Sequence, residues 1–104
     1  MCAIFGLIDY NRVFSAHQRE RILRVLSVEC EVRGVDATGF AFNSGGKLKI
    51  FKRPLPAHEV SLTLRDDANI ILGHTRMETQ GDSRQNFNNH PFLGKCNNTR
   101  FALV

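Results

Sequence analysis

Residues 3–8 read AIFGLI and directly follow Met1 and Cys2. A short apolar run bounded by turn residues predicts a strand that is buried on both faces. The residues on its far side, 9–11, read DYN and carry side chains typical of turns. The chain is therefore expected to enter its core with its first strand, and a cysteine stands at the head of that strand.

A helix is expected to follow. Ser15 can serve as its N-cap, and the helix is expected to run to about Arg33. Gly34 would end it, because glycine readily takes the positive φ of a helix C-terminus. A strand over 37–42 comes next. The helix gains one apolar face from residues that recur at helical spacing: Ile22, Leu23, Leu26 and Cys30.

The next segments predict strands separated by turns. Residues 43–46, NSGG, predict a hairpin turn, and the alternation in KLKIFK predicts a following strand over 47–52 with one exposed face. A short helix is expected over 57–64, and a compact apolar strand, NIILG, over 69–73. No internal repeat and no linker divides these elements, so they are expected to form one domain over residues 1–104.

Residues 76–99 are rich in Asn, Gly, Asp and Thr and show little periodicity. They predict one long loop, and loops of that length are usually functional or disordered. An apolar strand then begins at 101–104, where the sequence stops. Because domains normally end in polar or flexible residues, this ending predicts a truncated gene product or a cut within a longer protein.

The composition of the 104 residues, with 42% hydrophobic and 23% charged residues, is typical of a globular domain. No apolar run approaches the roughly 18 residues of a membrane span, and the basic start of a signal peptide is lacking. We therefore expect a cytoplasmic protein with no membrane partner. The basic residues behind the net charge of +4 are scattered, so a solvated surface is preferred over a nucleic-acid partner.

The cysteines and histidines predict neither disulfides nor metal. The three cysteines form no C-x-x-C pair, and their number is odd. The four histidines show no metal-ligand spacing. We therefore expect no metal site. The residues concerned are Cys2, Cys30, Cys96, His17, His58, His74 and His90.

Cys2 can carry chemistry if Met1 is removed, since it then bears a free α-amine beside its thiol. A nucleophile needs a base that is partly neutral at the working pH. The α-amine, with a pKa of about 7.7–8.0, meets that need better than a lysine amine with a pKa of about 10.4. The alternative is a small buried residue of the strand, which position alone favours.

Three segments together favour the nucleophilic role of Cys2 over the structural one: MCAIFG (1–6), RGVDATGFAF (33–42) and GHTRMETQGDSRQNFNNHPF (73–92). In this order and spacing they resemble the glutaminase domain of class II glutamine amidotransferases, which are N-terminal-nucleophile hydrolases. The likeness is greatest to the glutaminase half of glucosamine-6-phosphate synthase and covers nearly the whole chain. It implies an α+β fold of the αββα sandwich type, with two antiparallel sheets between helical layers, of which this chain would supply the N-terminal half.

The resemblance also implies a reaction. Cys2 matches the nucleophile that attacks the side-chain carboxamide of glutamine, giving a thioester and ammonia before water releases glutamate. Arg76 matches the arginine that holds the α-carboxylate of the substrate, a role suited to a guanidinium fork. Thr79 matches a threonine whose hydroxyl helps in that pocket. No metal and no cofactor is implied, and the ammonia acceptor stays unknown.

Four further residues match positions near the family's site. Arg33 and Asp36 belong to the pattern R-G-x-D-x-x-G and would pin the helix to the next strand. His74 begins the sequence H-T-R and would orient the end of its strand. His90 precedes a proline and is expected to anchor the backbone of the loop.

Two residues depart from the family. Met77 replaces an aromatic residue and can cover the methylenes of the substrate. Gln80 replaces a histidine or tryptophan and keeps a donor and an acceptor but cannot titrate. The loop over 76–99 is expected to close the pocket, which would exclude water until ammonia has left.

The family's oxyanion-hole segment would come after Val104, and the acidic residue that binds the α-amine has no counterpart. Losing one oxyanion donor typically costs about 10²–10³ in rate. Two interpretations therefore stay open. One is a glutamine amidotransferase with a synthase partner or a downstream domain; the other is a truncated or degenerate glutaminase-like binding module without catalysis. A homo-oligomer is compatible with both.

Overall fold

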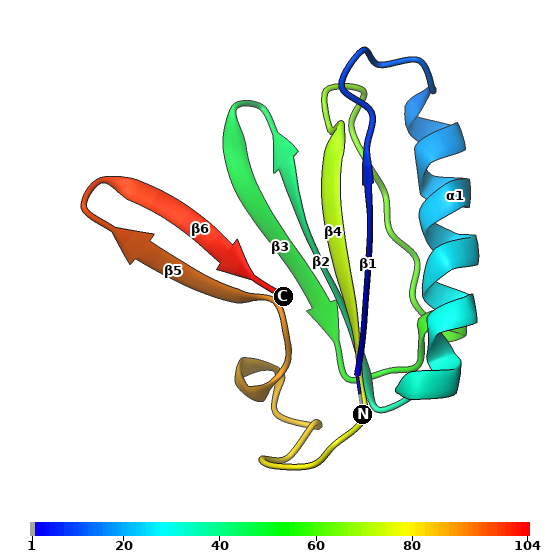
Figure 1. The fold of residues 1–104 in the computed structure, drawn as a ribbon, viewed down its shortest axis with the longest axis vertical. Coiled ribbons are helices and arrows are strands. Elements are labelled where there is room, and N and C mark those ends of the chain that lie inside the picture. The colour runs from blue at the N-terminus through cyan, green and yellow to red at the C-terminus, as the bar shows by residue number, and fades with distance from the viewer. Residues whose placement is uncertain (1) are drawn as a thin grey trace.

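A computed structural model describes residues 2–104 as an α+β fold with antiparallel sheets and one α-helix. Four strands form one sheet in the order β1-β4-β2-β3, and the hairpin β5–β6 projects on the side of this sheet away from α1 (Figure 1). In chain order the elements are β1 (Ala3–Ile8), α1 (Ala16–Glu29), η1 (Cys30–Arg33), β2 (Ala37–Ser44), β3 (Lys47–Arg53), η2 (Ala57–Glu59), β4 (Ile70–Arg76), η3 (Asn86–Asn88), β5 (Phe92–Cys96) and β6 (Thr99–Leu103).

The start of α1 confirms the predicted N-cap. The Ser15 hydroxyl accepts from the Gln18 backbone N–H at 3.1 Å, and the Gln18 side chain accepts from the Ser15 N–H at 2.8 Å. The predicted end is wrong by one turn, because the α-helix stops at Glu29 and continues only as a 3₁₀ turn. The predicted positive φ of Gly34 is also wrong, since its φ of −179° is extended backbone.

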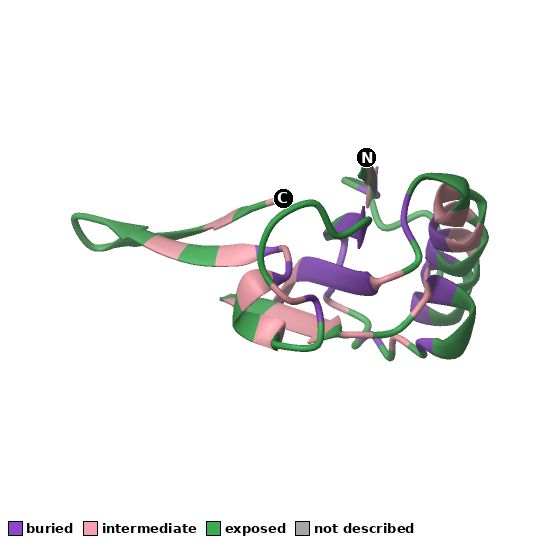
Figure 2. Cartoon of the chain, turned by 90° about the horizontal axis from the view of Figure 1, so that it is seen from below, coloured by how far each residue is buried: buried purple, intermediate pink, exposed green. Residues whose placement is uncertain are grey.

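The core lies between α1 and one face of the four-stranded sheet. Leu23 of α1 and Ile71 of β4 are fully buried, and the Phe5 and Phe40 rings meet edge to face at 5.6 Å. Buried residues gather between α1 and the sheet, whereas the β5–β6 hairpin is mostly exposed (Figure 2). The prediction of a first strand buried on both faces is wrong, because Ile4 and Ile8 are 62% and 66% exposed on the other face.

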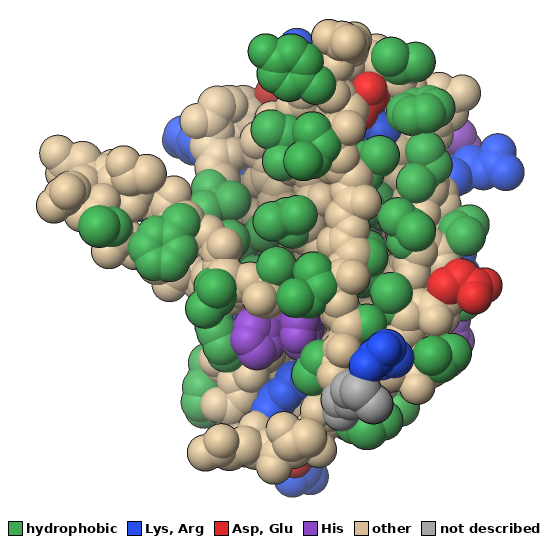
Figure 3. All heavy atoms as spheres, in the orientation of Figure 1, with side chains coloured by type: hydrophobic (Ala, Val, Ile, Leu, Met, Phe, Trp, Pro, Cys, Tyr) green, Lys and Arg blue, Asp and Glu red, His purple; other side chains and the backbone are tan. Residues whose placement is uncertain are grey.

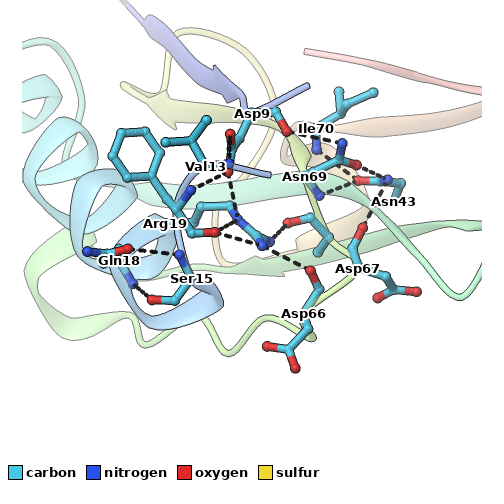
Figure 4. Close-up of polar contacts among 12 residues, drawn as sticks. Asp9, Val13, Ser15, Gln18, Arg19, Asn43, Asp66, Asp67, Asn69 and Ile70 are labelled. Atoms are coloured by element: carbon cyan, nitrogen blue, oxygen red, sulfur yellow. Dashed lines mark hydrogen bonds and ion pairs between the residues drawn. The ribbon is translucent and has the colours of Figure 1, made fainter. Parts of the chain in front are cut away.

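A buried ion pair closes the end of the sheet opposite the start of β1. The Asp9 carboxylate accepts from the backbone N–H groups of Val13 and Phe14 at 2.8 and 3.0 Å and pairs with Arg19 Nε at 3.3 Å (Figure 4). The Arg19 guanidinium also donates to the backbone carbonyls of Phe14, Asp66 and Ala68. This arrangement ties the turn after β1 to α1 and to the segment before β4.

Other expectations are confirmed or corrected along the chain. The hairpin over 43–46 and the strand after it are confirmed as β2–β3, and the strand predicted at 69–73 extends to Arg76. The helix expected over 57–64 is only the 3₁₀ turn η2, and the loop expected over 76–99 contains β5. Among the described residues, no helix has the length and apolar character needed to cross a membrane.

Candidate active site

A cavity of about 470 Å³ opens where β1 begins, β4 ends and β5 begins. Antiparallel pairing of β1 with β4, with Ala3 opposite Thr75, brings the first residues of the chain beside the end of β4. Six of the residues singled out in the sequence line this cavity, whereas Arg33, Asp36 and His74 do not. The lining residues are Cys2, Arg76, Met77, Thr79, Gln80, Gly81, Asn88, His90 and Phe92.

Cys2 is exposed and carries a free thiol. Its Sγ lies 3.8 Å from the carbonyl oxygen of Met77, to which the thiol donates. This contact spans from the start of β1 to the residue after β4 and places the thiol at the cavity. Met1, whose removal would free the α-amine of Cys2, lies outside the described residues.

Arg76 ends β4 with a buried side chain, only 6% exposed. Its Nη1 donates to Asn89 Oδ1 at 2.7 Å, and its Nη2 donates to the carbonyls of Gly81, at 3.1 Å, and Gln80. All three acceptors are neutral, and within residues 2–104 no carboxylate pairs with this guanidinium at ion-pair distance. Since a buried charge is costly unless it is compensated, the cavity favours an anionic ligand.

His74 and His90 stack beside this cation, with ring centroids 4.3 Å apart, and His90 stacks in turn on Phe92 at 4.2 Å. Figure 3 shows histidine side chains side by side at the base of the β5–β6 hairpin. Burial lowers the pKa of His74 to about 4, helped by His90 and Arg76. Burial also lowers the pKa of His90, helped by the positive charges of Arg76 and Lys52. The pair is therefore neutral at pH 7.

Asp36 holds the start of the loop that follows β4. Its carboxylate accepts from the backbone N–H of Glu78 at 2.6 Å, and its own backbone N–H donates to the carbonyl of Arg76 at 2.9 Å. Arg33 stands at the end of η1, just before Gly34. Asp36 thus connects the segment before β2 to the end of β4 and to the loop after it. The expectation that Arg33 and Asp36 pin the helix to the next strand stays a prediction.

Two residues at the site were missed by sequence reasoning. Asn89 is fully buried, and its side chain bonds Arg76. Lys52 of β3 donates from Nζ to the carbonyls of Asn89, at 2.7 Å, and Pro91, at 3.0 Å, and burial lowers its pKa. The sequence could have indicated Lys52, because it stands two residues after Ile50 at a position where the alternation of Leu48 and Ile50 predicts an apolar residue. No feature of the sequence distinguishes Asn89 from the other asparagines of its loop.

Gly39 explains how the loop comes so close to the sheet. It pairs with Lys52 in the β2–β3 register. A Cβ at this position would collide with the carbonyl oxygen of His90 and with the ring of Pro91. The second glycine of R-G-x-D-x-x-G is thus required because the backbone before β5 packs directly on β2.

The site sets a free thiol and a buried guanidinium, bonded to neutral acceptors, around one cavity of an α+β domain. The chain is 31% identical over 91 residues to glutamine–fructose-6-phosphate aminotransferase (isomerizing) of Halobacterium salinarum. The alignment covers 86% of this chain and 14% of that protein, so the chain spans about one-seventh of the length of this relative. No family model matches the chain, and no solved structure matches it significantly. This distant similarity supports a glutamine amidotransferase-like domain.

Proposed function

We propose that residues 1–104 are the N-terminal part of a glutamine amidotransferase domain that hydrolyses the side-chain amide of glutamine to glutamate and ammonia. The observation that carries this proposal is the shared cavity of Cys2 and Arg76, which offers a nucleophile and a cation together. The similarity to a glutamine-utilising aminotransferase supports it.

The chemistry needs the free α-amine that removal of Met1 would expose. The amine takes the thiol proton while Sγ of Cys2 attacks the amide carbon. The C–N bond breaks, the amine returns its proton to the leaving nitrogen, and a thioester and ammonia result. Water then attacks the thioester, the C–S bond breaks, and glutamate leaves as the thiol is restored.

Glutamine would be recognised through the positive charge of Arg76. The α-carboxylate of glutamine would bind Arg76, because charge-assisted hydrogen bonds from a guanidinium are strong and directional. Met77 would cover the methylenes, and Thr79 and Gln80, which also line the cavity, would offer polar groups. The loop after β4 would close over the substrate and keep water out until ammonia has left.

The wider architecture follows from the same proposal. Ile4 and Ile8 are exposed on the face of the sheet opposite α1, which supports an αββα sandwich in which a second sheet covers that face. A synthase domain or partner would take up the ammonia, and we expect the protein in the cytoplasm.

A binding module without catalysis is the second candidate, and one observation favours it. Within residues 2–104, the hydrogen bond of the Cys2 thiol goes to a backbone carbonyl and not to a basic side chain. Without the α-amine as base, no basic side chain bonded to the thiol would take its proton, and the cavity would only bind.

Two measurements separate these candidates. Intact-mass spectrometry reports whether Met1 is removed, and a glutamate-release assay compares the complete domain implied by this proposal with its Cys2→Ala and Cys96→Ala variants. Cys96 is the matched control, since it is also an exposed free thiol but lies in β5, away from the cavity. Turnover that only Cys2→Ala abolishes supports the enzyme. Glutamine binding without turnover, in the complete domain after loss of Met1, supports the binding module.

A further inference from the structure

We propose that Asn89 is a positioning residue that fixes the Arg76 guanidinium for an incoming carboxylate through a neutral hydrogen bond. This inference rests on the proposed function of the same cavity. The amide oxygen of Asn89 accepts from Arg76 Nη1 at 2.7 Å, and Asn89 has no exposed surface.

The side-chain amide of Asn89 can adopt only one orientation. Its Nδ2 donates to the carbonyl of Ser83 at 2.7 Å and to Oδ1 of Asn86 at 3.2 Å. A flipped amide would set its NH₂ group against the N–H of Arg76 and its oxygen against two acceptors. The amide is therefore locked with its oxygen toward the guanidinium.

The backbone of Asn89 is held just as firmly. Its carbonyl accepts from Lys52 Nζ at 2.7 Å, and its N–H donates to the carbonyl of Asn86 at 3.0 Å. Lys52 belongs to β3, so this contact connects the regular sheet to Asn89 and from there to Arg76. A fixed cation loses less conformational entropy when it binds a ligand than a mobile one does.

The neutrality of Asn89 is as important as its geometry. Three of the five N–H groups of Arg76 are taken by neutral oxygens, and within residues 2–104 the Nε–H and one Nη1–H have no acceptor. The guanidinium thus keeps two donors for a ligand, and none of its bonded acceptors is a carboxylate, although the Asp82 carboxylate lies near enough for Arg76 to lower its pKa. An aspartate at position 89 would occupy the same volume but would neutralise the charge of the guanidinium.

The test is a comparison of two ligands that needs no turnover. Calorimetry in a Cys2→Ala background measures the binding of L-glutamine and of its analogue with a carboxamide in place of the α-carboxylate. We expect the background protein to prefer glutamine by on the order of 10²-fold. Asn89→Ala and Asn89→Asp should each reduce this preference to about threefold or less while the analogue still binds.

Asn86→Ala is the matched control. It removes a loop hydrogen bond to Asn89 and another to the Lys52 carbonyl, but none to Arg76. If Asn89 only stabilised the loop, Asn86→Ala would change the preference as much as the Asn89 variants do, and we expect it to stay near its original value. Should Asn89→Ala fail to fold, the near-isosteric Asn89→Asp decides.

The outcomes keep this inference separate from the proposed function. If Arg76→Gln abolishes the preference but folded Asn89 variants retain it, the role of Asn89 is overturned and the proposed function is untouched. If the preference depends on Asn89 but the complete domain, with Cys2 intact and Met1 removed, releases no glutamate, the hydrolysis is overturned and the role of Asn89 stands. If neither ligand binds, both are overturned.

Discussion

Gly34 lies against the peptide bond that joins Arg76 to Met77. A Cβ at position 34 would stand 2.5 Å from the carbonyl carbon of Arg76 and 2.8 Å from the backbone nitrogen of Met77. Since the φ of Gly34 is extended, the requirement for glycine comes from this approach and not from backbone conformation. The end of the helical segment is therefore in direct contact with the backbone of the cavity.

Gly34→Ala should destabilise the protein by about 2–4 kcal/mol, because the added methyl group meets backbone atoms that cannot rotate away. Urea unfolding measures the change. Val35→Ala, at a half-exposed neighbouring position, is the control and should change stability by no more than about 0.5 kcal/mol. Equal unfolding midpoints for Gly34→Ala and the unmodified chain would show that the two backbones are not in contact.

Arg19→Ala should cost about 3–5 kcal/mol of stability, because it leaves the buried Asp9 carboxylate without its cation. It also leaves the carbonyls of Phe14, Asp66 and Ala68 without this donor. Arg21→Ala on the exposed side of α1 is the matched control and should stay within about 0.5 kcal/mol of the unmodified chain. A similar loss in both variants would mean that the Asp9–Arg19 pair does not stabilise the fold.

Local signals predicted most of the four-stranded sheet and its helix. The capping box at Ser15 and the NSGG turn are short-range features, and both appear where the sequence places them. β5 was missed because FLGKC has a central glycine and no alternation, and it forms by pairing with β6. The segment after Glu59 has no helix because its backbone bonds elsewhere, as when the Leu64 N–H donates to Glu20 of α1 at 2.8 Å.

The candidate site, like the fold, was predicted from the sequence only in part. Cys2 and Arg76 were predicted from the family motifs that they match, and the structure places both around one cavity. Their action on a substrate stays a prediction. Asn89 and Lys52 act through contacts with residues 13 and 37 positions away, which no local pattern encodes. Gly34 was noticed for the wrong reason, since its extended φ shows that packing, not a helix cap, requires it.

Stability should fall in mild acid because of His74. The pKa of this buried imidazole is lowered to about 4 in the folded state, against 6.5 as its ordinary value. Between these pH values the unfolded chain binds more protons than the folded chain, so stability is present above pH 6.5 and is lost as the pH falls toward 4. The contribution is at most about 3 kcal/mol. Urea unfolding at about pH 7 and about pH 4.5 measures it, and an unchanged pH slope in His74→Gln would contradict this assignment.

The two stacked histidines should respond differently to their cationic neighbours. Arg76 lowers the pKa of both, whereas Lys52 lowers that of His90. Lys52→Met should therefore raise the pKa of His90 and leave that of His74 near its original value. Arg76→Gln should raise both, and Arg76→Lys, which keeps the charge, is the control. NMR titration of the two imidazoles measures these shifts, and a rise of the His74 pKa alone in Lys52→Met would be the opposite of the expected result.

The thiols of Cys2 and Cys96 should react at different rates with an electrophilic analogue of glutamine. Cys2 and Cys96 are both exposed and free, but only Cys2 lines the cavity with Arg76. A glutamine analogue with a chloromethyl ketone in place of the amide should therefore alkylate Cys2, with loss of chloride, faster than it alkylates Cys96 by on the order of 10²-fold, since binding holds it beside the thiol. Peptide mass spectrometry measures both rates. Arg76→Gln should remove the selectivity, and iodoacetamide, which has no carboxylate, supplies the intrinsic reactivity of each thiol. Equal labelling of Cys2 and Cys96 by the analogue, after this correction, would show that the cavity does not recognise glutamine.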